Sequence, residues 1–300
     1  MATLDEKLVA PRRDLDNLRA VLFMLGSIGF FSAMFASGRF VGDEASALQI
    51  YFLRFLGGFL TVLCVALVLR RSASSLRSRK PSLQVLRIFG GAFGGVALVH
   101  ANANMPIVDA NAISQLSAIF LVVLGMAFLG ERPRAWHFVA ILVCVLGAAT
   151  VMAARGAFSN FSPAYLGPAS IALLGALLMA FESLFIKLLT RVDDMLTTLL
   201  YANALGTLIL LVPALLTWQS WGAVNLALLA LGPLAILAQY CTFRGYMLAD
   251  VTLIAPIKYS GLIFAAAIGW IFFAEAPTLG VVLGACLIAA GGIRLATLRR

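Results

Sequence analysis

The chain has 300 residues, of which 62% are apolar and only 12% are charged, and its mean hydropathy is +1.00. These are too few polar residues to cover a soluble domain, which carries about twice this charged fraction. The composition excludes a soluble globular enzyme, a disordered chain and a secreted disulfide scaffold. It predicts an all-α protein that crosses a membrane many times. The four cysteines lie far apart in apolar runs, so neither a metal site nor a disulfide framework is predicted.

Apolar runs separated by polar, Gly or Pro residues predict ten spanning helices, each of about 20 residues. The third and fourth runs are nearly continuous, as are the eighth and ninth. One helix across either pair would be about twice as long as a bilayer requires, so each pair is divided. The predicted spans are residues 18–37, 47–69, 83–105, 108–129, 136–154, 164–188, 195–217, 224–247, 251–274 and 277–296.

The basic residues fix an orientation for these spans. With a cytoplasmic amino terminus, most of the 22 Lys and Arg fall in the tails and loops of one side, Arg87 and Lys187 among them. The positive-inside rule therefore predicts that both termini are cytoplasmic. Arg54 lies inside the second span, and we expect it to form a salt bridge with charged residues of the loop before it. The net charge of +9 is then an orientation signal and does not indicate a nucleic-acid partner.

The second half of the chain repeats the pattern of the first. Asp109 corresponds to Asp250 and Glu131 to Glu275, and all four are interpreted as helix-capping residues at turns. Each half holds five spans, and because five is odd, the second half enters the membrane from the opposite side. Such inverted repeats are typical of secondary transporters. The predicted division is a cytoplasmic tail (1–17), a first five-helix repeat (18–155), a periplasmic linker (156–163) and a second repeat with a short cytoplasmic tail (164–300).

Three short segments carry a resemblance to a known family. Leu53-Arg54-Phe55 and the paired corners Gly130-Glu131-Arg132 and Ala274-Glu275-Ala276 resemble the drug/metabolite transporter superfamily, in its EamA branch. The chain is most similar to bacterial exporters of aromatic amino acids from that branch. The resemblance implies a ten-helix basket around a central cavity, lined by the first, third, fourth, sixth, eighth and ninth spans. It also implies alternating access in a bacterial inner membrane without an ATPase subunit, and the sequence has no phosphate-binding loop.

Two ionisable side chains inside the predicted spans are candidates for substrate recognition. Such a group costs at least about 2.5–3.5 kcal/mol near the bilayer centre. Lys258 follows Pro256 in the ninth span, and with Tyr259 it is predicted to bind the carboxylate of a substrate. A lysine that snorkels toward the cytoplasmic headgroups explains the same position. Glu182, in the sixth span, is a candidate gate or proton-carrying residue, with a structural ion pair as the alternative.

Further polar and aromatic residues complete the predicted substrate site. His100, Gln115 and Gln239 are predicted to hydrogen-bond the substrate, and Phe30 and Tyr240 to stack on its apolar part. Hydrogen bonds between helices are the alternative for the polar residues. Packing or lipid contact is the alternative for the aromatic ones.

These observations predict a secondary transporter and no enzyme. We expect it to need no cofactor, to contact the lipid bilayer, and to export small metabolites, aromatic and other apolar amino acids first among them. A broad exporter of drugs or metabolites is the alternative. An intramembrane enzyme ranks low because the sequence lacks clusters such as His-Glu-x-x-His, and the inverted repeat counts against a non-transporting subunit.

Overall fold

The computed structural model describes residues 3–41, 44–72, 74–160, 162–219 and 222–297. Within these ranges every regular element is a helix. The elements are α1 (Thr3–Val41), α2 (Ala47–Val68), α3 (Pro81–Asn104), α4 (Ile107–Ser114), α5 (Leu116–Leu129), α6 (Ala135–Ala154), η2 (Pro163–Tyr165), α7 (Leu166–Leu189), α8 (Met195–Leu216), α9 (Ala223–Leu248), α10 (Val251–Ile254), η3 (Ala255–Tyr259), α11 (Ser260–Phe273) and α12 (Leu279–Thr297).

The helices confirm an all-α membrane protein. Within the described ranges, nine segments are long and apolar enough to cross a membrane, and α3, with 24 residues, has the length of a tenth. The fourth span consists of α4 and α5, and the ninth of α10, η3 and α11. The first helix is longer than its span. Because α1 begins at Thr3, residues 3–17 of the segment predicted as a tail continue the helix of the first span.

The two halves share the corner that follows their fourth span. α5 is followed by Gly130 in the left-handed conformation (φ 66°), and the next amide donates to the carbonyl of Gly125 at 3.3 Å. α11 is followed by Ala274 in the same conformation (φ 55°), and the next amide donates to Gly269 at 3.0 Å. Glycine is the usual residue at such a helix end, and the second half keeps the geometry with alanine. The sequence repeat is therefore a structural repeat.

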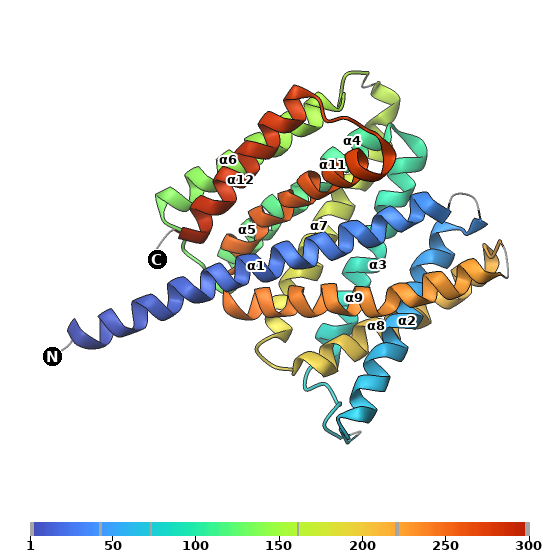
Figure 1. The fold of residues 1–300 in the computed structure, drawn as a ribbon, viewed down its shortest axis with the longest axis horizontal. Helices are drawn as coiled ribbons and strands as arrows, with labels where there is room; N and C mark the ends of the chain where they lie inside the picture. Colours follow the sequence, from blue (N-terminus) through green and yellow to red (C-terminus); the bar gives the residue numbers. More distant parts are fainter. Residues whose placement is uncertain (1–2, 42–43, 73, 161, 220–221, 298–300) are drawn as a thin grey trace.

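The helices pair across the two halves. α6 and α12 lie side by side at one edge of the molecule, while α1 packs on α9 and α3 packs on α7 (Figure 1). In the repeat, α1 corresponds to α7 and α3 to α9, so the last two pairs are equivalent contacts. α2 packs on α8 and α9. The beginning of α1 and the end of α12 lie on the same side of the molecule (Figure 1).

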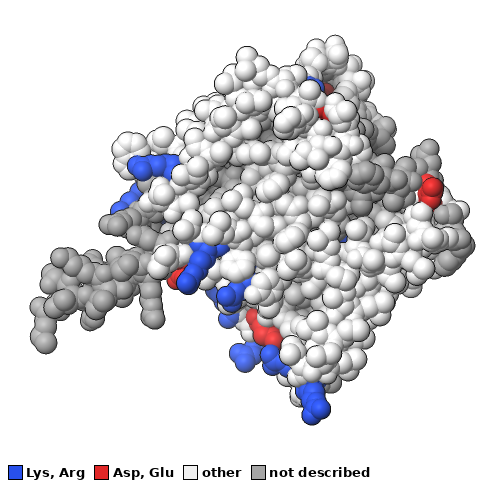
Figure 2. Space-filling model, in the orientation of Figure 1, with Lys and Arg blue, Asp and Glu red and all other residues white. Residues whose placement is uncertain are grey.

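Charged residues gather on that same side. Figure 2 shows Lys and Arg along the lower left edge, and a broad face with almost no charge beside it. We call the loops 70–80 and 190–194 the basic edge; Arg70, Arg71, Arg77, Arg79, Lys80 and Arg191 are exposed there. Many large apolar side chains elsewhere are exposed, Leu67 and Leu216 among them. An apolar belt of this kind is what a bilayer covers.

Helices α6 and α12 approach each other closely through glycine. A Cβ on Gly291 of α12 would lie 2.5 Å from the Sγ of Cys144 and 2.9 Å from the carbonyl oxygen of Ala140, both on α6. A Cβ on the neighbouring Gly292 would meet no described atom within 4 Å. Small residues let membrane helices pack backbone to backbone, and here one glycine has that role while its neighbour does not.

We expect Gly291→Ala to destabilise the protein by about 1–3 kcal/mol, because the added methyl group overpacks the α6–α12 contact. The measurement is thermal unfolding of the purified protein in detergent. Gly292→Ala is the matched control and should leave the midpoint unchanged or raise it, since alanine favours helix. Equal effects of the two substitutions would contradict this view of the contact.

Candidate functional site

The ninth span is interrupted at the depth where its lysine lies. The α-helical turn α10 ends at Ile254, and residues 255–259 form a 3-10 turn before α11 resumes the span. Pro256 lies in this turn and lacks the amide that a continuous helix would use. Irregular backbone at membrane depth is tolerated where protein surrounds it, and residues 251–257 are all buried. The interruption places Lys258 inside the bundle.

Lys258 is held by the sixth span. Its Nζ donates a hydrogen bond to the Oγ of Ser183 on α7 at 3.0 Å, and that hydroxyl donates to the carbonyl of Met179 at 3.1 Å. The lysine is half-buried, and its ammonium points to another helix. The structure therefore gives Lys258 a specific partner inside the protein, which a purely snorkelling lysine does not have.

The carboxylate of Glu182 lies against the backbone of α3. A Cβ on Gly91 would be 2.9 Å from its carboxyl carbon and 3.0 Å from each of its oxygens, so a side chain at this position would displace the carboxylate. Glu182 is half-buried, and it interacts electrostatically with Arg87, Lys258 and Arg54. The neighbouring Ser183 is the partner of Lys258. Consecutive residues of α7 thus join a carboxylate and an ammonium in one cluster.

Two arginines that were expected elsewhere also belong to this cluster. Arg87 was assigned to the cytoplasmic cations, yet it is 6% exposed, and its guanidinium donates one long bond, of 3.5 Å, to the carbonyl of Thr198. Arg54 is 8% exposed; its guanidinium lies 4.0 Å from the centre of the Phe55 ring and 5.3 Å from that of Tyr51. The expected salt bridge of Arg54 with the loop before it is absent among the described residues, and Glu182 is the carboxylate that acts on it. We call Arg54, Arg87, Glu182 and Lys258 the charged cluster.

The turn between α9 and α10 is held by two further charged side chains. The Nζ of Lys187, on α7, donates to the carbonyls of Tyr246 and Ala249 at 2.6 and 2.7 Å. The carboxylate of Glu131 accepts the first two amides of α10, at 2.8 Å each. A cation at a helix carboxyl end and a carboxylate at an amino end both suit the helix dipole. They fix the start of the ninth span, and with it the turn that carries Lys258.

These contacts revise the expected caps. Glu131 is a cap, as predicted, but it caps a helix of the other repeat. Asp250 makes no side-chain capping bond to α10. Asp109 accepts the amide of Phe158 at 2.6 Å and so ties α4 to the turn after α6. Lys187, expected among exposed cytoplasmic cations, is 6% exposed.

Gln239 and Tyr240 of α9 have protein partners. Gln239 is 8% exposed and exchanges two hydrogen bonds with Asn203 of α8, at 3.0 and 3.3 Å. Its amide is therefore used between helices. Tyr240 packs edge-to-face on Phe23 of α1, with ring centres 6.2 Å apart. Phe30, the other aromatic residue predicted to stack on the substrate, is half-buried on α1.

Tyr259, Gln115 and His100 lie in three different environments. Tyr259 is 2% exposed and packs in a core cluster with Cys144 of α6 and Ile288 of α12, although it follows Lys258 directly. Gln115 is half-buried at the junction of α4 and α5, and its side-chain amide forms no hydrogen bond with a described residue. His100 is exposed near the end of α3. Among the eight predicted site residues, Lys258 and Glu182 interact with each other, and a shared substrate site that includes the other six stays a prediction.

His100 lines an open apolar groove between α3 and α7. The groove has a volume of about 520 Å³, and Phe89, Phe93 and Leu174 on its walls are half exposed or nearly so. Its remaining lining is almost entirely aliphatic or aromatic. Glu182 does not line it, because the carboxylate lies at Gly91 on α3 rather than at the groove. The groove is therefore separate from the charged cluster.

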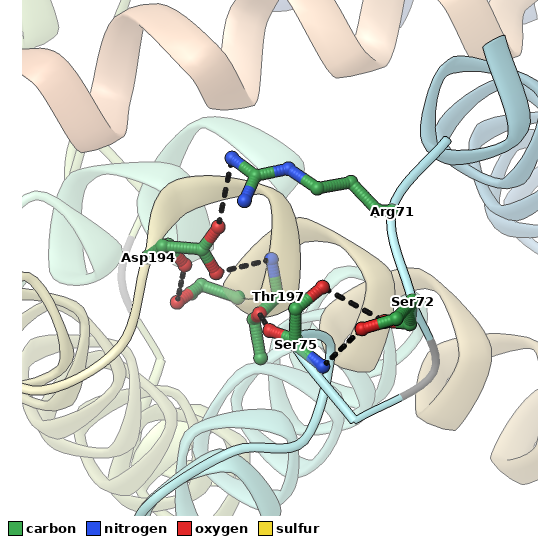
Figure 3. Close-up of polar contacts among 6 residues, drawn as sticks. Arg71, Ser72, Ser75, Asp194 and Thr197 are labelled. Atoms are coloured by element: carbon green, nitrogen blue, oxygen red, sulfur yellow. Dashed lines mark hydrogen bonds and ion pairs between the residues drawn. The ribbon is translucent and has the colours of Figure 1, made fainter. Parts of the chain in front are cut away.

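The basic edge joins the two repeats through a pair of aspartates. Asp193 accepts hydrogen bonds from the hydroxyl of Ser78, the amide of Arg79 at 2.8 Å and the side chain of Gln84 at 2.9 Å. Asp194 lies 3.9 Å from a guanidinium nitrogen of Arg71 and accepts the amide of Thr197 at 3.0 Å (Figure 3).

Figure 3 also shows Ser75, whose carbonyl accepts the hydroxyl of Thr197 at 3.5 Å. The loop between α2 and α3 is thus fastened to the loop between α7 and α8. We call these contacts of Asp193 and Asp194 the edge junction.

Comparison with known proteins identifies the fold. A profile described as the EamA-like transporter family matches residues 18–153 and again residues 167–297. A solved crystal structure shares the fold, with a TM-score of 0.77, 23% sequence identity, and coverage of 94% of this chain and 98% of that one.

Relatives with assigned names extend over most of the chain. The pseudopaline exporter CntI of Pseudomonas aeruginosa is 29% identical over 296 residues, which is 95% of this chain and 99% of the exporter. A riboflavin transporter of Rhizobium johnstonii is 30% identical over 239 residues, or 77% of this chain and 75% of that protein. An S-adenosylmethionine uptake transporter of Rickettsia felis is 23% identical over 272 residues, 90% of each chain.

The family profile matches each half of the chain separately. The repeated corner and the interrupted spans likewise indicate two equivalent halves. The relatives are transporters, and their names cover both export and uptake. The chain belongs to the EamA-like transporter family, and it is a membrane transporter of small molecules rather than an enzyme.

Proposed function

We propose that the protein exports small metabolites that carry a carboxylate, across the bacterial inner membrane and by alternating access. The observation that carries the proposal is the ammonium of Lys258, held at 3.0 Å by Ser183 inside the bundle and next to Glu182. A cation and a carboxylate on facing spans match the two charged ends of an amino acid. Aromatic and other apolar amino acids are the specific substrates that we propose first, with Lys258 at the carboxylate and Glu182 at the amine.

The proposed orientation has both termini in the cytoplasm. The basic edge supports it, because the exposed cations of loops 70–80 and 190–194 lie on the side where α1 begins and α12 ends. Cytoplasmic loops carry the excess of Lys and Arg. The edge junction is then a cytoplasmic contact, and the corner of α11 faces the periplasm.

A broad exporter of metabolites is the second candidate function. The names of the relatives favour it, because three proteins similar to this chain are named as transporters of chemically different compounds: pseudopaline, riboflavin and S-adenosylmethionine. Counterflow with several labelled compounds separates the two candidates.

For substrate choice, we expect proteoliposomes preloaded with phenylalanine or tryptophan to accumulate the same labelled amino acid by counterflow. Labelled uridine and tetraphenylphosphonium, a nucleoside and an organic cation, should show no protein-dependent uptake. Empty liposomes are the control. Uptake of all four compounds would favour the broad exporter, and uptake of neither amino acid would reject the first proposal.

For the lysine, we expect Lys258→Met to raise the KM of the transported amino acid about ten- to hundredfold. A hydrogen bond to a charged group is worth about 1.5–3 kcal/mol, and methionine keeps the length of the side chain without its charge. Lys80→Met, an exposed cation of the basic edge, is the matched control and should keep the KM of the wild type. An unchanged KM for Lys258→Met would remove this residue from the site.

The edge junction gives alternating access a closed cytoplasmic side. Asp193 is buried and joins the loop after α2, in the first repeat, to the loop after α7, in the second. Opening a path to the cytoplasm between the repeats requires these bonds to break. Three bonds to one carboxylate make that aspartate the centre of the contact.

We therefore expect Asp193→Ala to increase cytoplasmic access to the interior. The measurement is the labelling of Ser183→Cys by a membrane-impermeant maleimide in inside-out vesicles, with the four native cysteines replaced. A loss of about 1 kcal/mol of closing energy corresponds to labelling about fivefold faster. Asp16→Ala, which removes an exposed ion pair within α1, should leave the rate as it was. Equal labelling of both variants would exclude a closing role for Asp193.

A further inference from the structure

The charged cluster holds more positive than negative charge. Arg54, Arg87 and Lys258 all act electrostatically on Glu182, and Glu182 is the one carboxylate of the described residues that acts on all three. Near the bundle ends, Glu131 and Asp109 are engaged with backbone amides, and Asp193 is engaged with the basic edge. With its four groups ionised, the cluster carries two positive charges that no carboxylate of the described residues balances.

Both guanidinium groups keep free donors. Among the described residues, the buried Nε atoms of Arg54 and Arg87 have no hydrogen-bond partner, and the two side chains are 8% and 6% exposed. Arg87 forms one long bond to a carbonyl, and Arg54 lies over aromatic rings. An arginine fork matches a carboxylate with two parallel bonds. Donors of this kind, buried and unused, point to an anionic ligand that accepts their hydrogen bonds.

Burial makes this imbalance costly for the protein alone. Removing an ion from water is unfavourable unless a partner compensates, and a lone buried cation has no such partner. A zwitterionic amino acid would not correct the imbalance, since its ammonium and its carboxylate cancel. An anion with two acidic groups would balance it, with one group at Lys258 and another at the guanidinium groups.

We infer that the preferred substrate is a small organic anion with at least two acidic groups, and that Arg54 and Arg87 bind the group that Lys258 does not. This inference rests on the proposed function, because it takes the site around Lys258 as the substrate site. Arg54 and Arg87 are then specificity-determining residues. An amino acid with one added acidic group keeps the carboxylate of the proposed function but supplies only one net negative charge, whereas a dicarboxylate without an ammonium supplies two.

Binding to the purified protein tests the inference without transport. Glutarate and glutaramate have nearly the same size and differ by one carboxylate, and N-benzoyl-L-glutamate and N-benzoyl-L-glutamine add a ring to the same difference. At constant ionic strength and neutral pH, we expect the dicarboxylate of at least one pair to bind about tenfold or more tightly than its amide, by thermal shift or calorimetry. Equal affinities in both pairs, or no binding by any of the four, would overturn the inference.

Arginine variants show whether the cluster is responsible. Arg87→Gln and Arg54→Gln should each reduce the preference for the dicarboxylate toward one, mainly by weakening the dicarboxylate, and Arg87→Lys should restore part of it. Arg244→Gln is the matched control. Arg244 has a buried Nε without a partner and lies 5.6 Å from the Phe23 ring, but no electrostatic interaction links it to Glu182. If all three glutamine variants lose the same factor, or none does, the assignment to Arg54 and Arg87 is wrong.

The two levels of the proposal fail differently. Counterflow of phenylalanine or tryptophan without any preference for dicarboxylates would leave the proposed function and remove the inference. The opposite result is a dicarboxylate preference that Arg87→Gln abolishes, without counterflow of either amino acid. It would support the inference and reject aromatic amino acids as substrates.

Discussion

A bilayer offers no water to a buried polar group, so every interrupted helix must find its hydrogen-bond partners within the protein. The ninth span depends on this constraint. Lys187 satisfies two carbonyls where α9 ends, and Glu131 satisfies two amides where α10 begins. Since these side chains come from α7 and from the corner after α5, both repeats hold the turn. Lys258 lies two turns further along the chain, so Lys187 and Glu131 help to position it without contacting it directly.

The duplicated fold places equivalent backbone in both halves and different chemistry upon it. The left-handed corner recurs at Gly130 and Ala274, and both fourth spans are interrupted. When Glu131 is aligned with Glu275, Gln115 corresponds to Tyr259. A neutral amide thus stands at the break in the first half, and a lysine precedes the equivalent residue in the second. The scaffold is nearly symmetric, whereas the charges that we propose to select the substrate differ between the two halves.

The sequence was sufficient for the spans, the repeat and the capping role of Glu131, because hydropathy and charge at span ends report depth directly. The sequence did not reveal which side chains of different helices contact one another. Arg87 and Lys187 lie near predicted span ends, where an exposed and a buried cation have the same hydropathy. Gln239 is a residue type that often binds ligands, and its amide is hydrogen-bonded to Asn203 on another helix, a partner that its sequence position does not reveal. The space for Glu182 beside Gly91 is likewise a property of two helices, which a single periodic pattern cannot contain.

The excess charge of the cluster also bears on how substrate and conformation are coupled. A ligand shifts a conformational equilibrium only by its differential affinity for the two states. Closing around an empty cluster withdraws two uncompensated cations from water, whereas closing around the proposed dianion withdraws a balanced set. The loaded protein therefore closes at lower cost than the empty one. In the proposed mechanism, the bonds of Asp193 oppose opening at the basic edge in either case, and charge balance within the cluster would then determine when the exchange of states becomes favourable.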